Sequence, residues 1–432
     1  MKILVIGGGA REHALCWAIE RSPLCEKLYC APGNFGISGV AECVDIAITE
    51  IDKIVQFAVD NHIDFVMVGP EQPLVMGLAD RLRARDILVF GPSQQAAQLE
   101  GSKGYLKDLC REFGIPTAAY ERVYDMDAAQ RAIAKNLGGK IVIKADGLAA
   151  GKGVIIAENA DAAMDAAEEL LGDGDGQHAS LVIEEFMDGE EASFFALVDG
   201  ETTMALCAAQ DHKRVFDGDK GPNTGGMGAY SPAPVMPQSM IDLVMEKIIN
   251  PTARAMVKRG APFRGVLFAG LMITRDGPKL IEYNARFGDP ECQVIMPRLN
   301  GDWLAYLLAV ANGTLDKMPV PSWHDITTLA VVYAAKGYPG DYEKNTEIRG
   351  LEKLATMAGV SVFHAATKYK NGQVLATGGR VLSVVAEAIN ATEAQRKAYA
   401  AIAHVYWPGG FYRRDIGYRA VEREKSQLQK KA

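Results

Sequence analysis

The sequence predicts a multidomain protein that combines α/β and α+β domains, with a parallel sheet in its N-terminal domain. The chain has 432 residues, and at ~100–200 residues per domain this length corresponds to about two to four domains. Up to about residue 100, short β-branched runs alternate with longer amphipathic stretches, which is the rhythm of a βαβ sheet. From about residue 190 onwards strands are denser and helices fewer, which is typical of α+β domains.

The composition indicates a packed globular protein. Hydrophobic residues make up 48% and charged residues 23% of the chain, which is ordinary for a folded protein. The 46 Lys and Arg against 54 Asp and Glu give a formal net charge of −8, the wrong sign for general attraction to nucleic acids or anionic lipids. No apolar run approaches the ~20 residues of a membrane-spanning helix. We therefore expect no nucleic-acid partner and no membrane association.

Cysteine usage and the N-terminal segment predict a cytoplasmic protein. The seven cysteines are scattered, odd in number and without a CxxC pair, which argues against a zinc ribbon and a disulfide framework. The first residues enter a strand, Lys2–Ile6, with no signal-peptide core before it. Reduced thiols in the cytoplasm fit both observations.

A glycine-rich turn follows this first strand and opens a helix over Glu12–Glu20. Backbone N–H groups at a helix N-terminus favour an anion, so Gly7–Gly9 predicts a phosphate site. A dinucleotide site would also need an acidic residue at the end of the second strand. That strand ends in Tyr29–Asn34 without one, so the dinucleotide hypothesis is disfavoured. A tight turn that binds nothing is the other alternative.

The rest of this domain continues the same alternation of strands and helices. Strands are predicted at Lys27–Cys30, Phe65–Val68 and Leu88–Phe90, and helices at Ile51–His62 and Leu74–Ala84. Glu71 comes directly after a strand, at the carboxyl edge where open α/β sheets bind ligands. Its position alone makes it a candidate site residue.

After a break at Gly114-Ile115-Pro116, the pattern up to about residue 190 predicts a small α/β unit around a glycine-rich loop. Its elements are Ile141–Lys144, the loop Asp146–Gly153, Val154–Ala157, the helix Asp161–Leu171 and Leu181–Phe186. The loop is not a P-loop, because Gly153 stands where that motif requires Ser or Thr. Its glycines, with Lys144 before them and Lys152 among them, still predict N–H groups lying over a triphosphate. A plain flexible hairpin is the alternative.

The segment from about 191 to 325 is predicted to be an α+β body. Its elements are strands at Ser193–Val198, Met204–Gln210, Leu267–Ile273 and Lys279–Tyr283 and helices at Met240–Arg259 and Trp303–Asn312. Period-two spacing puts Glu282, Asn284 and Arg286 on one face of the last strand. Two oxygen ligands beside a guanidinium are suited to Mg²⁺ and phosphate oxygens; a salt-bridged strand is the alternative.

Two further features complete the pattern. Residues 221–232 are rich in Gly and Pro and follow Gln210–Arg214, which predicts a long ordered binding loop. Past His324, strands are expected at Leu329–Ala335, Val360–Ala365 and Gly379–Val385, with a helix at Ala391–Val405. The charged end of the chain, Glu422–Ala432, has little to bury and predicts a fraying helix.

Taken together, these motifs resemble the glycinamide ribonucleotide synthetase (phosphoribosylamine–glycine ligase) family of ATP-grasp enzymes. The resemblance extends from the N-terminus to about Glu424. The matching motifs are Gly-Gly-Ala-Arg-Glu-His at 8–13, Val-Gly-Pro-Glu at 68–71, Glu-Gly-Ser-Lys at 100–103, Lys-Ala-Asp-Gly-Leu-Ala-Ala-Gly-Lys-Gly at 144–153, the loop at 221–232 and the strand at 282–291.

The resemblance implies both an architecture and an activity. It implies a Rossmann-like phosphoribosylamine-binding domain (1–102), an ATP-grasp body (103–122 and 190–325), a mobile ATP-grasp lid (123–189) and a C-terminal α+β domain (326–432). The activity is ATP-dependent ligation of glycine to 5-phosphoribosylamine, through glycyl phosphate, to give glycinamide ribonucleotide, ADP and phosphate in de novo purine biosynthesis. ATP is then a co-substrate, Mg²⁺ or Mn²⁺ the cofactor, and the protein a monomer or weak homodimer.

The resemblance also implies roles for individual residues. ATP would be bound by Lys103, Lys144, Gly151, Lys152, Gly153, Glu184, Glu185, Phe186, Met187 and Glu191, with adenine on the backbone of 184–187 and the ATP ribose on Glu191. Glycine and phosphoribosylamine would be bound by Gly9, Ala10, Arg11, Glu71, Asp211, Lys213, Asn223, Thr224, Gly225, Asp289, Lys368 and Arg380. The metal ligands would be Glu282 and Asn284, and the catalytic residues Arg286, Lys144 and Asp289.

Within the acceptor site the resemblance distinguishes further roles. Glu71 would hold the ribose of phosphoribosylamine, and the phosphate of that substrate would be held by Gly9, Ala10, Arg11, Lys368 and Arg380. The acceptor site would be lined by Asp211, Lys213 and Asp289 and covered by the loop Asn223–Gly228.

Two departures from the family pattern and three alternative functions remain at this stage. Ala10 stands where the family has Gly, and Gly270 stands where the wider superfamily often has another metal carboxylate. The alternatives are another ATP-grasp carboxylate–amine ligase or biotin-carboxylase-like enzyme, a nucleotide-binding dehydrogenase, and a non-catalytic binding module.

Overall fold

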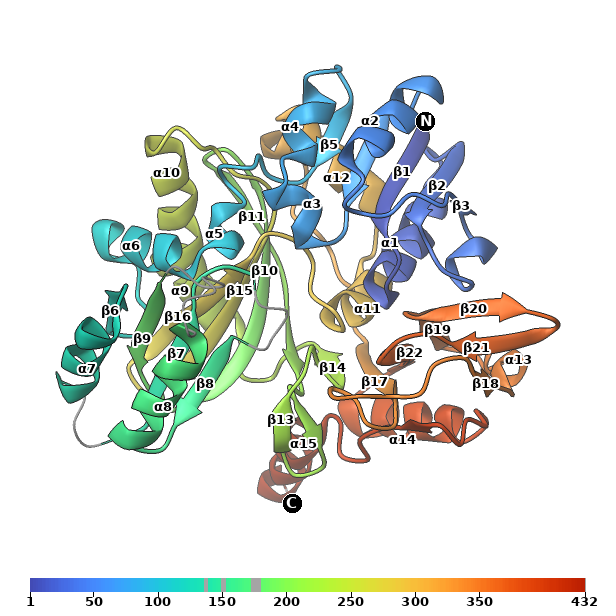
Figure 1. Ribbon diagram of the computed structural model, residues 1–432. Coiled ribbons are helices and arrows are strands. Elements are labelled where there is room, and N and C mark those ends of the chain that lie inside the picture. The colour runs from blue at the N-terminus through green and yellow to red at the C-terminus, as the bar shows by residue number, and fades with distance from the viewer. Residues whose placement is uncertain (136–138, 149–152, 172–179, 432) are drawn as a thin grey trace.

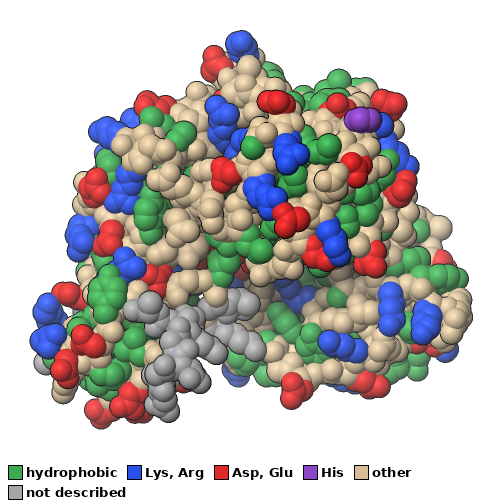
Figure 2. Space-filling model, turned by 45° about the horizontal axis from the view of Figure 1, so that its top comes forward, with side chains coloured by type: hydrophobic (Ala, Val, Ile, Leu, Met, Phe, Trp, Pro, Cys, Tyr) green, Lys and Arg blue, Asp and Glu red, His purple; other side chains and the backbone are tan. Residues whose placement is uncertain are grey.

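The structure is a computed structural model that describes residues 1–135, 139–148, 153–171 and 180–431 (Figure 1). It contains a five-stranded parallel sheet, a small four-stranded antiparallel sheet and a nine-stranded antiparallel sheet. The predicted combination of α/β and α+β parts is therefore confirmed. Within these ranges no helix is both long and apolar enough to cross a membrane. Figure 2 shows Lys and Arg side chains interspersed with Asp and Glu over one face of the molecule.

The N-terminal parallel sheet has the strand order β3-β2-β1-β4-β5. In the central strand, Leu4 and Ile6 belong to one hydrophobic cluster and Ile3 and Val5 to another. Both faces of the sheet are thus covered, which explains the continuous apolar run of its strands. The elements are β1 (Lys2–Gly7), α1 (Ala10–Glu20), β2 (Lys27–Pro32), β3 (Glu42–Cys43), α2 (Ile51–Asp60), β4 (Phe65–Val68), α3 (Glu71–Val75), α4 (Leu78–Arg83), β5 (Leu88–Phe90), α5 (Gln98–Gly101) and α6 (Lys103–Phe113).

The small antiparallel sheet has the order β6-β9-β7-β8 and its own apolar core. Ile141 and Ile143, which alternate along β7, are buried together with alanines of two helices. The elements are β6 (Tyr120–Val123), α7 (Met126–Lys135), β7 (Ile141–Ala145), β8 (Val154–Ala157), α8 (Ala160–Leu171) and β9 (Leu181–Glu185). In Figure 1 this unit lies beside the large sheet and opposite the C-terminal part.

The nine-stranded sheet has the order β16-β15-β10-β11-β14-β17-β22-β19, with β23 on β17. Its strands are β10 (Glu190–Asp199), β11 (Thr202–Asp211), β14 (Gly228–Ser231), β15 (Arg264–Thr274), β16 (Gly277–Asn284), β17 (Thr327–Ala335), β19 (Val360–His364), β22 (Arg380–Ala388) and β23 (Gly410–Phe411). The pairing of β14 with β17 makes the sheet continuous from the central body into the C-terminal part.

Helices flank this sheet, and a separate three-stranded sheet, β18-β21-β20, extends from the C-terminal part. The remaining elements are α9 (Gln238–Val244), α10 (Asn250–Lys258), α11 (Glu291–Ile295), α12 (Trp303–Asn312), β18 (Thr346–Ile348), α13 (Leu351–Leu354), β20 (Thr367–Lys370), β21 (Gln373–Ala376), α14 (Ala391–Ile402) and α15 (Tyr418–Lys431).

The structure corrects three sequence expectations. The loop predicted at 221–232 is largely a hairpin strand, β13 (Lys220–Asn223), paired with β12 (Arg214–Phe216), followed by β14. The helix predicted at Met240–Arg259 is interrupted by a π-helical turn at Met245–Ile249, because Pro251 has no N–H to donate to the preceding turn. The C-terminal helix, which was expected to fray, packs against the rest of the protein through its first turns.

That C-terminal helix, α15, begins at Tyr418, earlier than the predicted tail. Its first turns bury Ala420 and Val421, and Arg419 pairs with Asp219 at 2.6 Å. Arg423 pairs with Glu190 on β10. The helix therefore stabilises the β12–β13 hairpin and the start of β10.

A buried histidine pair joins α1 of the N-terminal part to β19 of the C-terminal part. His13 Nδ1 accepts the backbone N–H of His364 at 2.8 Å, and the ring of His364 bonds Thr367 Oγ1 at 2.9 Å. Burial lowers the pKa of His13 to about 3 and that of His364 to about 4. Both rings are therefore neutral in the folded protein near neutral pH.

This pair predicts a loss of stability in mild acid. The unfolded histidines have a pKa of about 6.5, so below that pH the unfolded chain binds more protons and stability falls with pH until the folded pKa values are reached. We expect the melting temperature to decline from about pH 6.5 to 4, and less steeply in His364→Gln. Thermal melts in this range test it, with the exposed His404→Gln as the matched control. An unchanged slope in His364→Gln would contradict the assignment.

Candidate active site

One cavity of about 560 Å³ lies where the N-terminal part, the small sheet, the large sheet and the C-terminal part of the chain meet. It is lined by Glu71 from α3, Val142 and Ile156 from the small sheet, Glu282 from the large sheet and Arg380 from the C-terminal part. Carboxyl ends of the N-terminal strands and the edge of the large sheet therefore face a shared space. Segments far apart in the sequence together form this site.

Most predicted site residues line this cavity. They are Arg11, Glu71, Lys103, Lys144, Gly153, Glu184, Glu185, Phe186, Met187, Glu191, Asp211, Lys213, Asn223, Thr224, Gly225, Glu282, Asn284, Arg286, Asp289 and Arg380. Gly9, Ala10 and Lys368 are not among the lining residues. Gly151 and Lys152 lie outside the described residues.

Two lysines are held by one buried carboxylate at the end of the cavity nearest the small sheet. Lys144 Nζ lies 3.0 Å from Glu184 Oε1 and Lys107 Nζ lies 3.0 Å from Glu184 Oε2. All three side chains are almost fully buried. Lys103 Nζ donates to the carbonyl of Gly147 at 2.8 Å, in the glycine-rich loop. Several cations are therefore positioned around a space that also contains the exposed Phe186 ring.

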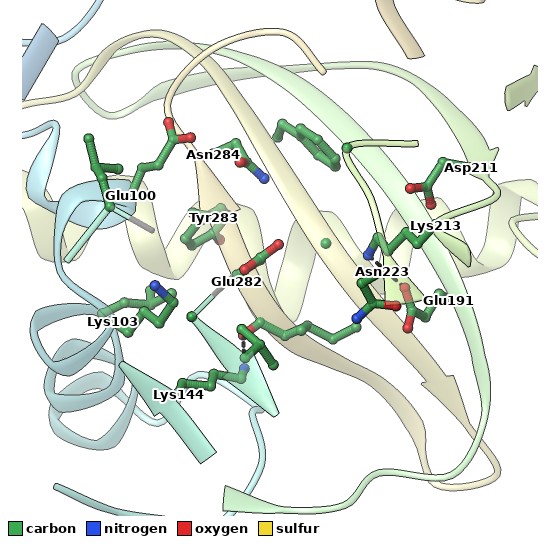
Figure 3. A pocket seen from close by; sticks show the side chains of 18 of the residues that line it. Glu100, Lys103, Lys144, Glu191, Asp211, Lys213, Asn223, Glu282, Tyr283 and Asn284 are labelled. Atoms are coloured by element: carbon green, nitrogen blue, oxygen red, sulfur yellow. Dashed lines mark hydrogen bonds and ion pairs between the residues drawn. The ribbon is translucent and has the colours of Figure 1, made fainter. Parts of the chain in front are cut away.

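A second charged group faces this end from β10 and β11. Lys213 Nζ pairs with Glu191 Oε2 at 2.6 Å, and Lys213 lowers the pKa of Glu191. Burial raises the pKa of the neighbouring Asp211 to about 7, although Lys213 opposes the rise. Figure 3 shows Asp211, Lys213 and Glu191 together on one side of the cavity.

Strand β16 brings two oxygen-bearing side chains to the middle of the cavity. Figure 3 shows Glu282 between Lys103 on one side and Lys213 on the other, with Asn284 further along the strand. Gly270 on β15 pairs directly opposite Glu282, and a Cβ there would lie 3.4 Å from Glu282 Cγ. The residue opposite Glu282 thus adds no second carboxylate, and a side chain there would contact Glu282.

These two side chains fit a hard divalent cation, because Mg²⁺ and Mn²⁺ prefer carboxylate and amide oxygens. Among the described residues no group of three or more His, Cys, Asp and Glu side chains is arranged to hold a metal. A cation at Glu282 and Asn284 would therefore need phosphate or water oxygens for its remaining positions.

Arg286 lies between the N-terminal part and the large sheet. Its Nε pairs with Glu71 Oε2 at 3.1 Å and its Nη2 with Glu100 Oε1 at 2.9 Å. Burial would raise the pKa of Glu71, but Arg286 and Arg11 outweigh it and lower that pKa. Burial raises the pKa of Glu100 to about 7 despite its pairing with Arg286.

In the predicted phosphate turn, the backbone N–H of Gly9 is bonded by a side chain of the helix that follows. The N–H of Gly9 donates to Glu12 Oε2 at 2.7 Å, and Arg11 Nε pairs with Glu12 Oε1 at 2.6 Å. Arg11 also donates to the carbonyl of Phe287 at 3.2 Å. Glu12 therefore satisfies the N–H of Gly9 in this structure and orients Arg11 towards the cavity.

Arg380 connects the C-terminal part to the short loop after β13. Its Nη1 donates to the carbonyls of Gly225 at 2.6 Å and Asp289 at 2.7 Å, and its Nη2 pairs with Asp289 Oδ2 at 3.1 Å. A Cβ on Gly225 would lie 2.9 Å from this guanidinium, which explains a glycine there. Lys368 is exposed on β20, the strand whose Thr367 carbonyl accepts the N–H of Phe35.

Sequence reasoning missed several residues of the site. Glu100 and Glu291 line the cavity, as does Tyr338 of the C-terminal part, and Lys107 shares Glu184 with Lys144. Lys107 stands four residues after Lys103 on α6, and that spacing places both lysines on one helix face. Glu100 stands within the Glu-Gly-Ser-Lys motif, but nothing local to it shows that Arg286 is its partner.

The fold and the site define an ATP-grasp protein, and comparison with known families gives its family. The N domain, ATP-grasp (A) domain and C domain of phosphoribosylglycinamide synthetase match residues 1–100, 101–292 and 328–419. These models together cover most of the chain, which therefore belongs to the phosphoribosylglycinamide synthetase family of ATP-grasp ligases.

Individual relatives agree with this assignment. The phosphoribosylamine–glycine ligase of Brucella melitensis is 56% identical over 427 residues, which is 99% of this chain and 100% of that protein. The chloroplastic phosphoribosylamine–glycine ligase of Arabidopsis thaliana is 52% identical, over 96% of this chain and 79% of that protein. A crystal structure of the Thermotoga maritima phosphoribosylamine–glycine ligase superposes with a TM-score of 0.84 at 31% identity, over 96% of this chain and 100% of that one.

A more distant likeness shows the fold alone. Biotin carboxylase from Campylobacter jejuni superposes with a TM-score of 0.73 at 16% identity, over 95% of this chain and 92% of that one. The overall fold is therefore shared beyond the family.

Proposed function

We propose that this protein ligates glycine to 5-phosphoribosylamine with ATP, through glycyl phosphate, and so forms glycinamide ribonucleotide, ADP and phosphate in purine biosynthesis. The observation that carries the proposal is the shared cavity, in which the lysine-rich end beside the small sheet is continuous with the end that holds Glu71 and Asp289. Membership of the family supports the choice of substrates.

The first step is transfer of a phosphoryl group. A carboxylate oxygen of glycine attacks the γ-phosphorus of ATP, and the bond from phosphorus to the ADP oxygen breaks. Lys103 and Lys144 neutralise the phosphate oxygens, and Arg286 stabilises the transferred group. This chemistry needs positioning and charge stabilisation rather than a protein nucleophile. A Mg²⁺ or Mn²⁺ ion held by Glu282 and Asn284 would supply further charge neutralisation at the phosphates.

The second step forms the amide bond. The amine nitrogen of phosphoribosylamine attacks the carbonyl carbon of glycyl phosphate, phosphate leaves, and the nitrogen loses a proton. Glu71 binds the ribose hydroxyls, and Arg11 attracts the 5-phosphate. Asp289 and Lys213 orient the glycine ammonium and carboxylate. Because Asp289 is itself held by Arg380, its orientation is set before the substrate arrives.

An acyl phosphate must be kept from water, because hydrolysis would waste ATP. Val142, Val154 and Ile156 of the small sheet line the cavity and present apolar surface over the nucleotide end. Phe186 and Met187 line the same end, where we place the adenine on the backbone of 184–187. We place the ATP ribose on Glu191.

The cellular setting is part of the same proposal. The seven cysteines are free thiols, which fits a reducing compartment such as the cytoplasm. We propose a cytoplasmic monomer or weak homodimer that uses Mg²⁺ or Mn²⁺. Sedimentation of the purified protein and turnover with each metal test these points.

The activity is tested by release of ADP and phosphate from Mg-ATP, glycine and freshly generated phosphoribosylamine, with each omitted in turn and the product identified by mass. We expect release to need all three and glycinamide ribonucleotide to form. Release that needs bicarbonate instead would favour a biotin-carboxylase-like reaction, and release without phosphoribosylamine would contradict the assigned acceptor.

A further inference from the structure

The guanidinium of Arg286 is held from three directions. Nε pairs with Glu71, Nη2 pairs with Glu100, and Nη1 donates to the carbonyl of Phe287 at 3.2 Å. The Arg286 side chain is 16% exposed and lines the cavity. Each of its three nitrogens thus has a protein partner, so its direction is set by the groups around it.

The two carboxylates hold Arg286 in different ways. The Glu100 side chain is 7% exposed, and its Oε2 accepts the backbone N–H of Ala285 at 2.7 Å. Glu100 is therefore tied to both the backbone and the side chain at the end of β16. The Glu71 side chain is 32% exposed and comes from the N-terminal part, where the proposed acceptor binds.

The third partner is a weaker anchor, because it is shared. The carbonyl of Phe287 accepts both Arg286 Nη1 and Arg11 Nη1, each at 3.2 Å. An acceptor that binds Glu71 and Arg11 would therefore compete for Glu71 and disturb the Phe287 carbonyl that Arg11 shares. These are two of the three partners of Arg286. Glu100 is the remaining group, and its other oxygen is bonded to the backbone N–H of Ala285.

We propose that Glu100 is a positioning residue, which holds the Arg286 guanidinium beside the phosphoryl group while the acceptor engages Glu71. The inference rests on the proposed function and adds to it a residue that acts only through Arg286. Glu100 is more buried than Glu71 and is bonded to the backbone, so it fixes the guanidinium more closely, and a small misplacement of a group at the reacting centre can lower the rate strongly.

The substitution Glu100→Gln isolates this role. The amide keeps the size of the side chain and can still accept the N–H of Ala285, but its NH₂ group then faces the donors of Arg286. We expect kcat to fall about 10- to 100-fold, because Arg286 would no longer be held in place to stabilise the transition state. The KM for ATP should change less than about threefold, because the substitution does not alter the residues proposed to bind ATP.

The decisive measurement is a double-mutant cycle of kcat over the wild type, Glu100→Gln, Arg286→Gln and the double variant. Because Glu100 acts through Arg286, adding Glu100→Gln to Arg286→Gln should change kcat less than about twofold. Glu112→Gln is the matched control, since it removes a more exposed carboxylate of α6 that pairs with Arg259. Thermal melts and ADP affinity verify folding.

Three results would overturn the inference. They are a Glu100→Gln kcat within about twofold of the wild type, losses that multiply in the double variant, and a wild type that forms no glycinamide ribonucleotide. The last would remove the proposed function as well, whereas the first two leave it intact. If Glu100→Gln does not fold, the same cycle is run with Glu100→Asp, which keeps the charge but withdraws it from Arg286.

Discussion

Replacement of Glu282 by glutamine is expected to lower the turnover number by at least about 100-fold while the protein stays folded. Glu282 projects into the middle of the cavity (Figure 3), with Gly270 opposite it on β15. The amide has the same size but no charge, so a divalent cation bound as proposed would lose the carboxylate of Glu282 while the packing stays similar. Steady-state kinetics at saturating Mg-ATP, glycine and phosphoribosylamine measure the loss.

The control for this experiment lies on the same hairpin. Asp276→Asn removes a carboxylate at the exposed turn between β15 and β16 and should leave turnover unchanged. Titration with Mg²⁺ adds a second readout, because Glu282→Gln should raise the metal concentration needed for half-maximal rate. Near-wild-type turnover with unchanged metal dependence would remove Glu282 from the site.

Replacement of Glu71 by alanine is expected chiefly to raise the apparent KM for phosphoribosylamine. Charged hydrogen bonds contribute ~1.5–3 kcal/mol each, so the KM should rise about 10- to 100-fold. Because Glu71 also pairs with Arg286, a smaller decrease in kcat should accompany it. The KM for ATP should stay near the wild-type value, since Glu100 still holds Arg286.

Gln72→Ala is the matched control for Glu71, as an exposed neighbour on the same short helix. It should leave all kinetic constants unchanged. A Glu71→Ala variant in which only the ATP kinetics change would show that the N-terminal part does not bind the acceptor. The proposed division of the cavity into a nucleotide end and an acceptor end would then be wrong.

Local patterns were enough to single out a few residues of the candidate site, whereas most of its residues came from the resemblance to a known family. Short apolar runs alternating with amphipathic stretches predicted the N-terminal sheet, and the position of Glu71 after a strand predicted its place at the carboxyl edge of that sheet. The spacing of Glu282 and Asn284 on one strand predicted that both face the same way, and both line the cavity. These features follow from backbone geometry within a few residues, so the sequence alone expresses them.

Contacts between distant segments could not be predicted in this way. Glu100 and Arg286 are separated by most of the body, and their pairing depends on how α5 packs against the end of β16. That Arg380 binds a phosphate stays a prediction, but only the tertiary structure shows that its guanidinium contacts two glycine carbonyls and Asp289. The long predicted loop became β13 and β14 because partner strands from elsewhere supply their hydrogen bonds.

The residue types of the site can thus be identified within short stretches of sequence, whereas the contacts that orient them join residues far apart in the chain. Short stretches of sequence are enough to predict the class of fold, the glycine turns and the main carboxylates and cations, because these depend on residue type and spacing. Other features arise only when distant elements pack together. They are the orientation of Arg286, the sharing of Glu184 by Lys107 and Lys144, and the continuity of the nine-stranded sheet. Their free energy comes from burial and pairing across the fold, which no local window of sequence contains.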